Sequence, residues 1–101
     1  MDIKQERQGT TLKLALSGRM DAVTAPQFNT LLEKELDGVT ELILDLAGLE
    51  YIASAGLHSL LIAQKRMKHL GEMKLIHVGD NVRDIFEMTG FSSFLTIESA
   101  E

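Results

Sequence analysis

Residues 41–70 read ELILDLAGLEYIASAGLHSLLIAQKRMKHL, and this stretch decides the fold of the chain. The continuous apolar run at residues 42–46, interrupted only by Asp45, is typical of a strand buried on both faces. A polar turn follows, and then leucines recur at helical spacing until Gly71, which favours a helix stop. The pattern predicts a strand, a turn and an amphipathic helix whose N-cap is Ser54.

The preceding residues predict a β-hairpin and a first helix. Apolar and more polar residues alternate over residues 12–17, which is the period of a strand with one buried face. Residues 3–8 are expected to pair with that strand across a turn at Gly9. Gly18 to Asp21 should then leave the strand, and Thr24 with Gln27 resembles the capping box of a helix over residues 25–36.

The residues after Gly71 predict one more strand, one more helix and an apolar tail. Residues 73–78 read as a strand, and Asn81 with Asp84 should open a third helix that ends at Gly90. The apolar tail is expected to form a short terminal strand from Phe91, Phe94, Leu95 and Ile97.

The element order ββαβαβα(β) implies parallel crossovers and helices laid on a sheet. We therefore predict an α/β fold with a mixed four- to five-stranded sheet and about three to four helices packed on it. At 101 residues and 45% hydrophobic content, the chain suits a single domain over residues 1–101.

Composition excludes several classes of function. The chain has no cysteine, which rules out disulfides and thiolate metal clusters, and its net charge of −5 argues against nucleic-acid binding. No segment approaches the roughly 20 apolar residues of a membrane span. A cytoplasmic protein whose partner is a protein or a small molecule is expected.

Ser54 is the residue best placed to carry function. The first backbone N–H groups of a helix lack partners, so an anion built on this hydroxyl would meet a favourable field. An ordinary N-cap worth roughly 1 kcal/mol is the simpler interpretation. Small neighbours at Ala53, Ala55 and Gly56 nevertheless leave the hydroxyl accessible to a partner protein.

Catalysis and cofactor binding have little support. Ser54, His58 and either Asp21 or Asp45 have the residue types of a hydrolytic triad, but Ile52 occupies the first glycine position of a G-x-S-x-G elbow. The three histidines lack ligand spacing, and the glycines form no phosphate-binding loop. We expect no enzyme activity, no metal and no cofactor.

The predicted second helix also offers a docking surface. Leu57, Leu60 and Leu61 define its core side. The opposite side is expected to carry Ala55, Ser59, Ile62 and Arg66. An outward Ile62 is typical of a surface that meets another protein.

The chain resembles the STAS domain family, and within it the stand-alone anti-sigma factor antagonists. Three segments carry the resemblance and together span most of the chain: SGRMDAVTAPQF at residues 17–28, DLAGLEYIASAGLHSLL at 45–61 and VRDIFEMTGFSSFLTI at 82–97. The second is the most specific. It is similar to the family pattern of Asp-Leu, a short turn, an aromatic residue, then Asp or Ser, Ser, a small residue, Gly and Leu.

The resemblance implies a binding switch. In such proteins the serine matching Ser54 is phosphorylated by an anti-sigma factor that is a serine kinase with a histidine-kinase-like ATPase fold. The unphosphorylated antagonist sequesters this kinase and frees a sigma factor, and a PP2C-type phosphatase resets the switch. Asp21 matches the acidic residue of the neighbouring loop. The expected partner surface consists of Met20, Asp21, Ala22, Thr24, Ala53, Ala55, Gly56, His58, Ser59 and Ile62.

The chain departs from the family pattern at one position, and two alternative functions remain open. Ala53 stands where family members commonly carry Asp or Ser. The first alternative is a STAS scaffold or interaction subunit of a transporter or signalling complex that is never phosphorylated. The second is nucleotide binding, which some STAS domains are suspected of and for which this sequence offers no phosphate loop.

Overall fold

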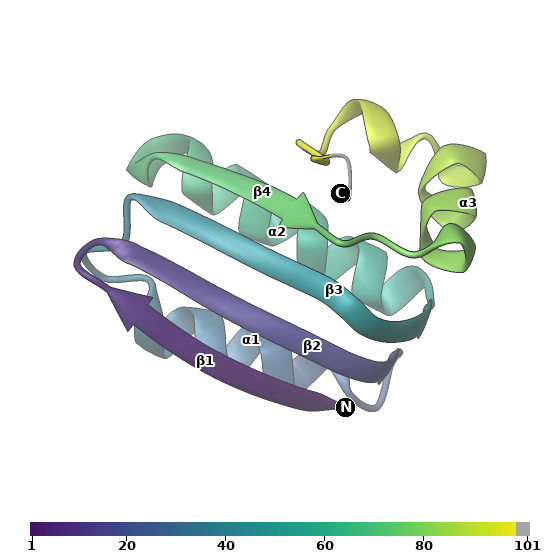
Figure 1. The fold of residues 1–101 in the computed structure, drawn as a ribbon, viewed down its shortest axis with the longest axis horizontal. Coiled ribbons are helices and arrows are strands. Elements are labelled where there is room, and N and C mark those ends of the chain that lie inside the picture. Colours follow the sequence, from purple (N-terminus) through teal and green to yellow (C-terminus); the bar gives the residue numbers. More distant parts are fainter. Residues whose placement is uncertain (99–101) are drawn as a thin grey trace.

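The computed structural model describes residues 1–98, which form a four-stranded sheet in the order β1-β2-β3-β4 (Figure 1). Strand β1 is antiparallel to β2, while β2, β3 and β4 run parallel. The predicted mixed α/β fold is therefore confirmed. The strands are β1 (Asp2–Gln8), β2 (Thr11–Met20), β3 (Glu41–Ile52) and β4 (Glu72–Ile76).

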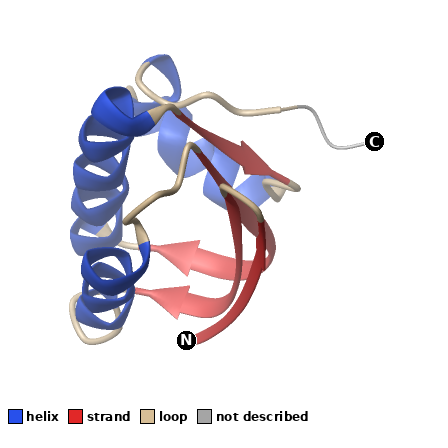
Figure 2. Cartoon of the chain, turned by 90° about the vertical axis from the view of Figure 1, so that its left-hand side faces the viewer, coloured by secondary structure: helices blue, strands red, loops and turns tan. Residues whose placement is uncertain are grey.

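Three α-helices and a short 3₁₀ turn complete the domain. Helices α1 and α2 lie side by side on one face of the sheet, and the opposite face is open (Figure 2). Helix α3 packs near the carboxyl end of β3. The helices are α1 (Ala25–Glu35), α2 (Ser54–Leu70) and α3 (Asp80–Thr89), and the 3₁₀ turn is Phe91–Ser93.

The core lies between the sheet and the two covering helices. Alternate strand residues, such as Leu12, Leu14 and Leu44, are fully buried there, as the period-two pattern requires. On the helix side, Phe28 and Leu60 are equally buried. No helix among the described residues is long and apolar enough to cross a membrane.

The prediction that β3 is buried on both faces is wrong. Glu41, Ile43 and Asp45 point to the open face and are half-exposed. The two carboxylates are paired across the sheet, because the ammonium nitrogen of Lys74 lies 3.2 Å from a Glu41 carboxylate oxygen and that of Lys13 lies 4.0 Å from Asp45. The run of apolar letters concealed this alternation because Ile43 is itself apolar.

The turn predicted after residue 46 is also wrong, because β3 continues to Ile52 and β2 to Met20. The register moves from Ala15↔Asp45 to Ser17↔Gly48, and again from Gly18↔Leu49 to Arg19↔Tyr51. Each shift leaves one extra residue on β3, so both are bulges that bend the strand without ending its pairing. Each inserted residue interrupts the period-two alternation, so periodicity alone does not show that the strand continues.

Two predicted helix starts need correction. Ala53 is the N-cap of α2 and Ser54 is its first helical residue. Helix α3 begins at Asp80 after the N-cap Gly79, one residue earlier than the predicted Asn81.

The capping box predicted for α1 is not formed. Thr24 is the N-cap of this helix, but its side chain makes no cap hydrogen bond to the helix. Its hydroxyl instead accepts from the Asp21 N–H and donates to the Arg19 carbonyl.

The C-terminal tail forms the 3₁₀ turn and then a single bridge in place of the predicted strand. Ile97 pairs with Leu75 in parallel orientation, and Leu95 packs into the core. Phe94, which directly follows the 3₁₀ turn, is 60% exposed.

Candidate functional site

Ser54 lies exposed at the start of α2, where β3 ends. Its own side chain caps nothing, and the first intrahelical bond runs from the Leu57 N–H to the carbonyl of Ala53 at 3.0 Å. The N–H groups of the first turn therefore lack intrahelical partners and create the partial positive field expected of a helix N-terminus. The Ser54 hydroxyl is exposed to solvent within that field.

The loop after β2 is held against this helix start by the backbone. The Ala53 N–H donates to the Met20 carbonyl at 2.9 Å, directly after the last register pair Met20↔Ile52. Gly56 lies over the same point, since a Cβ there would be 2.9 Å from the Met20 carbonyl oxygen and 2.7 Å from Ile52. Only glycine allows α2 to approach β2 this closely.

Residues 21–24 of this loop form a tight hydrogen-bonded turn. One carboxylate oxygen of Asp21 accepts from the N–H groups of Val23 at 3.0 Å and Thr24 at 3.1 Å. The Thr24 hydroxyl accepts from the Asp21 N–H at 2.9 Å and donates to the Arg19 carbonyl at 2.8 Å. The bonds from the Thr24 and Val23 N–H groups lower the pKa of Asp21, so this carboxylate is charged at neutral pH.

A stripe of exposed side chains continues along α2 from Ser54. His58, Ile62 and Arg66 follow at intervals of four residues, which places all four on one helix face. Ile62 is 39% exposed, so the prediction that it points outward is confirmed. Together with Asn29 and Glu33 of α1, Ile62 and Arg66 line a shallow hollow of about 150 Å³.

Three residues of the expected partner surface are buried. Met20 is fully buried, Ser59 is 1% exposed and Gly56 is also inaccessible. The prediction that Ser59 faces outward is wrong, because the helix turns this residue toward the sheet alongside Leu60 and Ala63. A partner cannot contact these three buried residues directly on the folded domain.

The other expected contacts remain accessible. Ala22 and His58 are exposed, whereas Asp21, Thr24, Ala53 and Ala55 are half-buried around Ser54. This part of the predicted surface stays a prediction, and the structure brings its members to one end of the sheet.

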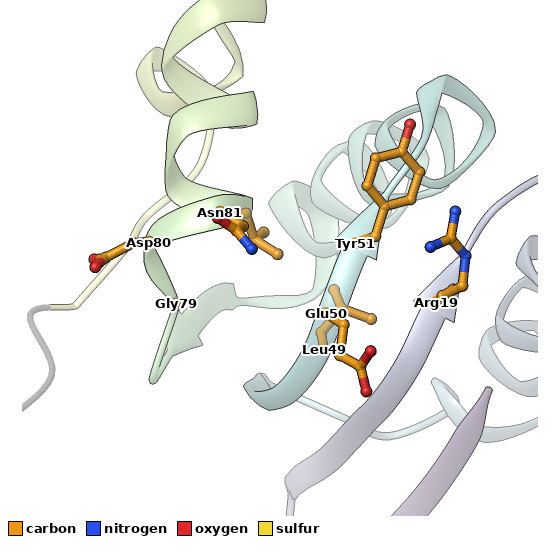
Figure 3. Close-up of a pocket in the computed structure, with 8 residues that line it drawn as sticks. Arg19, Leu49, Glu50, Tyr51, Gly79, Asp80 and Asn81 are labelled. Carbon is orange, nitrogen blue, oxygen red and sulfur yellow. The ribbon is translucent and has the colours of Figure 1, made fainter.

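Sequence reasoning did not predict that an arginine and a tyrosine stack next to this end of the sheet. The Arg19 guanidinium lies 4.5 Å from the centre of the Tyr51 ring, and both line a hollow of about 440 Å³ that also meets Asp80 and Asn81 at the start of α3 (Figure 3). Tyr51 fits the aromatic position of the family pattern. Its pairing with Arg19 arises from the second bulge, which no local sequence signal reveals.

The residues of the hypothetical triad do not assemble. Asp45 lies beside His77, with its Oδ1 3.0 Å from the imidazole Nδ1, while Asp21 bonds its own loop. Among residues 1–98, no three side chains of the metal-ligating types cluster. The described residues therefore offer binding groups around Ser54 and no visible nucleophile–base pair.

Known proteins resemble this chain over nearly its whole length. The STAS domain family matches residues 2–101. BtrV of Bordetella bronchiseptica, a candidate anti-sigma factor antagonist, is 30% identical over 99% of this chain and 88% of its own length. The anti-sigma-B factor antagonist of Listeria monocytogenes is 30% identical over 96% of this chain and 87% of its own.

Solved structures share the fold at lower identity. The anti-sigma factor antagonist SpoIIAA in its unphosphorylated form superposes with a TM-score of 0.85, at 19% identity, over 99% of this chain and 89% of that one. The Bacillus cell fate determinant SpoIIAA in the phosphorylated form superposes with a TM-score of 0.77, at 18% identity, over 99% of this chain and 92% of that one. The family match, the two relatives and the common fold lead to one conclusion: the chain belongs to the STAS domain family.

Proposed function

We propose that this protein is a cytoplasmic anti-sigma factor antagonist that binds an anti-sigma factor serine kinase and is released by phosphorylation of Ser54. The observation that carries the proposal is the exposed Ser54 hydroxyl at the first position of α2, beside the hydrogen-bonded loop 21–24. The relatives that are antagonists, and the solved phosphorylated form of a protein with this fold, support it.

The unphosphorylated surface is the binding-competent one. Ala22, His58 and Ile62 are open to solvent around Ser54 and can meet the kinase directly. A backbone hydrogen bond from the Ala53 N–H to the Met20 carbonyl joins the end of β2, just before loop 21–24, to the start of α2. Binding therefore requires little rearrangement of this chain.

Phosphorylation would oppose docking without unfolding the domain. A phosphoserine carries roughly −1.5 to −2 charge at neutral pH. The N-terminal end of α2 tolerates that charge, because the helix dipole and the unpaired N–H groups favour anions there. Within a desolvated interface beside the charged Asp21, the same phosphate repels the partner. A PP2C-type phosphatase would then restore the binding state.

The proposal is tested with the purified kinase from the same organism and ATP. Mass spectrometry should place a single phosphate on Ser54, and Ser54→Ala should accept none. Ser54→Asp should lose binding to the kinase, whereas Ser54→Ala retains it. Ser92→Asp, which adds the same charge at an exposed serine of the 3₁₀ turn, is the matched control and should bind normally.

Two results would contradict the proposal. The first is a phosphate on a residue other than Ser54. The second is equal binding by Ser54→Ala and Ser54→Asp, which would favour the unphosphorylated scaffold as the function of this domain.

A further inference from the structure

His58 is the first ionisable side chain on α2, and it lies one helical turn after Ser54. Residues four apart on a helix are neighbours on one face, with Cβ atoms about 5–6 Å apart. Both side chains are exposed. Among residues 1–98 the His58 ring has no charged partner, in contrast to His77, whose ring contacts Asp45. The His58 ring is therefore free to pair with a charge on its neighbour.

The direction of the helix brings His58 toward Ser54. A helical side chain leans toward the N-terminus of its helix, so His58 covers the surface over the preceding turn. An acidic group four residues before a basic one is also the favourable order for an ion pair on a helix. A phosphate on Ser54 would therefore find the imidazole on its own helix face, without a change in the backbone.

The two covering helices bring no other cation close to Ser54. The next charged residue on α2 is Lys65, about three turns after Ser54, and residues 25–32 of α1 carry no charge. Within the first two turns of α1 and α2, His58 is the only side chain that can carry a positive charge. It is therefore the helix residue that can act on a charge at Ser54.

Asp21 is the charged residue of the loop beside Ser54. Its carboxylate is ionised at neutral pH and opposes a second negative charge nearby. Other ionisable side chains at this end of the sheet line the hollow at the start of α3: Arg19, Glu50, Tyr51 and Asp80. A phosphate on Ser54 would therefore meet a like charge from the loop, and His58 is placed to offset it.

We propose that His58 is the intramolecular cation of the phosphorylated switch: its protonated imidazole donates to the phosphate on Ser54 and holds that phosphate in the dianionic form. This inference rests on the proposed function, which supplies the phosphate. A phosphoserine has a second pKa of about 6, so mildly acidic solution converts part of it to the monoanion. A cation within ion-pair range favours the dianion and moves this protonation to lower pH. The phosphorylated form thus keeps its full repulsive charge at a pH where an unpaired phosphoserine loses part of it.

The test uses the full chain with phosphoserine incorporated at position 54 during its synthesis, so that no kinase is needed. A pH titration followed by phosphorus NMR gives the midpoint of phosphate protonation. The midpoint of His58→Gln should lie about 0.3 pH units or more above that of the unsubstituted phosphoprotein, the size expected of one i,i+4 ion pair. His58→Lys, which restores a cation, should return the midpoint to the unsubstituted value or below.

His69→Gln is the matched control. His69 is exposed on the same helix but lies about four turns from Ser54, so its removal should leave the midpoint unchanged. In about 1 M NaCl the difference between the unsubstituted phosphoprotein and His58→Gln should shrink, because salt screens an exposed ion pair. Thermal unfolding of the unphosphorylated variants should match the wild type, since both histidines are exposed.

The outcomes distinguish the two proposals. Equal midpoints for the unsubstituted phosphoprotein and His58→Gln would overturn the pairing and leave the proposed function standing. An equal rise of the midpoint in His69→Gln would assign the effect to the overall charge of the domain and would also overturn the pairing. Failure of the kinase to phosphorylate Ser54 would instead count against the proposed function, and the titration of the incorporated phosphoserine does not depend on that result.

Discussion

At the residue scale, the Asp45 side chain connects two segments that are distant in the sequence. Its carboxylate accepts from the Ala47 N–H at 3.0 Å, where β3 begins to bulge, and contacts the His77 ring at 3.0 Å. His77 adopts a positive φ of 56°, a conformation disfavoured for a residue with a side chain. Asp45 thus ties the connection after β4 to the middle of β3.

The environment of Asp45 makes stability depend on pH. Partial burial by itself would raise the pKa of this carboxyl, but the hydrogen bonds from Ala47 and His77 and the charge of Lys13 outweigh it and lower the pKa. A carboxyl with a lowered folded-state pKa stabilises the fold above its unfolded pKa of about 3.9. That contribution is lost as the pH falls through the folded-state value.

We predict that Asp45→Asn makes the free energy of unfolding depend less on pH below about pH 5. The amide keeps an acceptor for the Ala47 N–H and removes the titrating charge. Urea unfolding at pH 7 should show the variant to be less stable than the wild type, and the difference should shrink from about pH 5 downward as the wild-type carboxylate is protonated. Asp37→Asn, at an exposed carboxylate, is the control; a constant difference for Asp45→Asn at every pH would contradict the prediction.

At the scale of single elements, the start of α2 combines a poor N-cap with an exposed serine at its first helical position. Ala53 has the extended backbone of an N-cap, with φ −95° and ψ 177°, but no side-chain group to accept from the helix N–H groups. Family members commonly carry Asp or Ser at this position, and both are strong N-caps. With Ala53 at this position, helix α2 therefore lacks a side-chain cap that would stabilise its N-terminus.

We predict that Ala53→Ser and Ala53→Asp stabilise the domain by about 1 kcal/mol, within the usual range of an N-cap. Denaturant unfolding at pH 7 measures this gain. Ser54→Ala should change stability by less than about 0.5 kcal/mol, because the Ser54 side chain makes no cap hydrogen bond. A loss of stability in both Ala53 variants would show that their side chains cannot reach the helix N–H groups.

At the scale of the whole molecule, the two edges of the sheet are protected differently. Exposed Lys4, Glu6 and Arg7 place charge along the β1 edge, which discourages pairing with another chain. The β4 edge is covered by the C-terminal tail: the Leu75 N–H donates to the Thr96 carbonyl at 2.9 Å, and the Glu98 N–H donates to the Leu75 carbonyl at 2.9 Å (Figure 1).

Ending the chain at Phe94 should therefore uncover β4. We expect the shortened protein to unfold at lower urea concentration and to self-associate, because it loses Leu95 from the core and leaves strand N–H and carbonyl groups unpaired. Size-exclusion chromatography with light scattering measures the association. Glu98→Ala, which removes the ion pair between Glu98 and Lys74 but keeps the backbone bonds, should remain as monodisperse as the wild type. A monomeric truncation of wild-type stability would refute this role of the tail.

Much of the fold was predictable because its signals are local. The alternation of Leu12, Leu14 and Leu16 and the helical spacing of Leu57, Leu60 and Met67 depend only on the periods of strand and helix. These patterns predicted the hairpin, the helices and their order, and the order in turn implied parallel crossovers. The pattern around Ser54 was equally local, which is why the sequence identified this residue as the candidate site.

The sequence by itself therefore determined the element order, the family and the candidate serine. Only the tertiary structure decided that β3 bulges and continues to Ile52, that Ser59 is buried, and that Val23 is exposed. The physical reason is that periodicity shows which side chains share a face, whereas burial depends on which distant elements cover that face. Exposure of a loop tip and strand register are likewise settled by contacts between segments far apart in the chain.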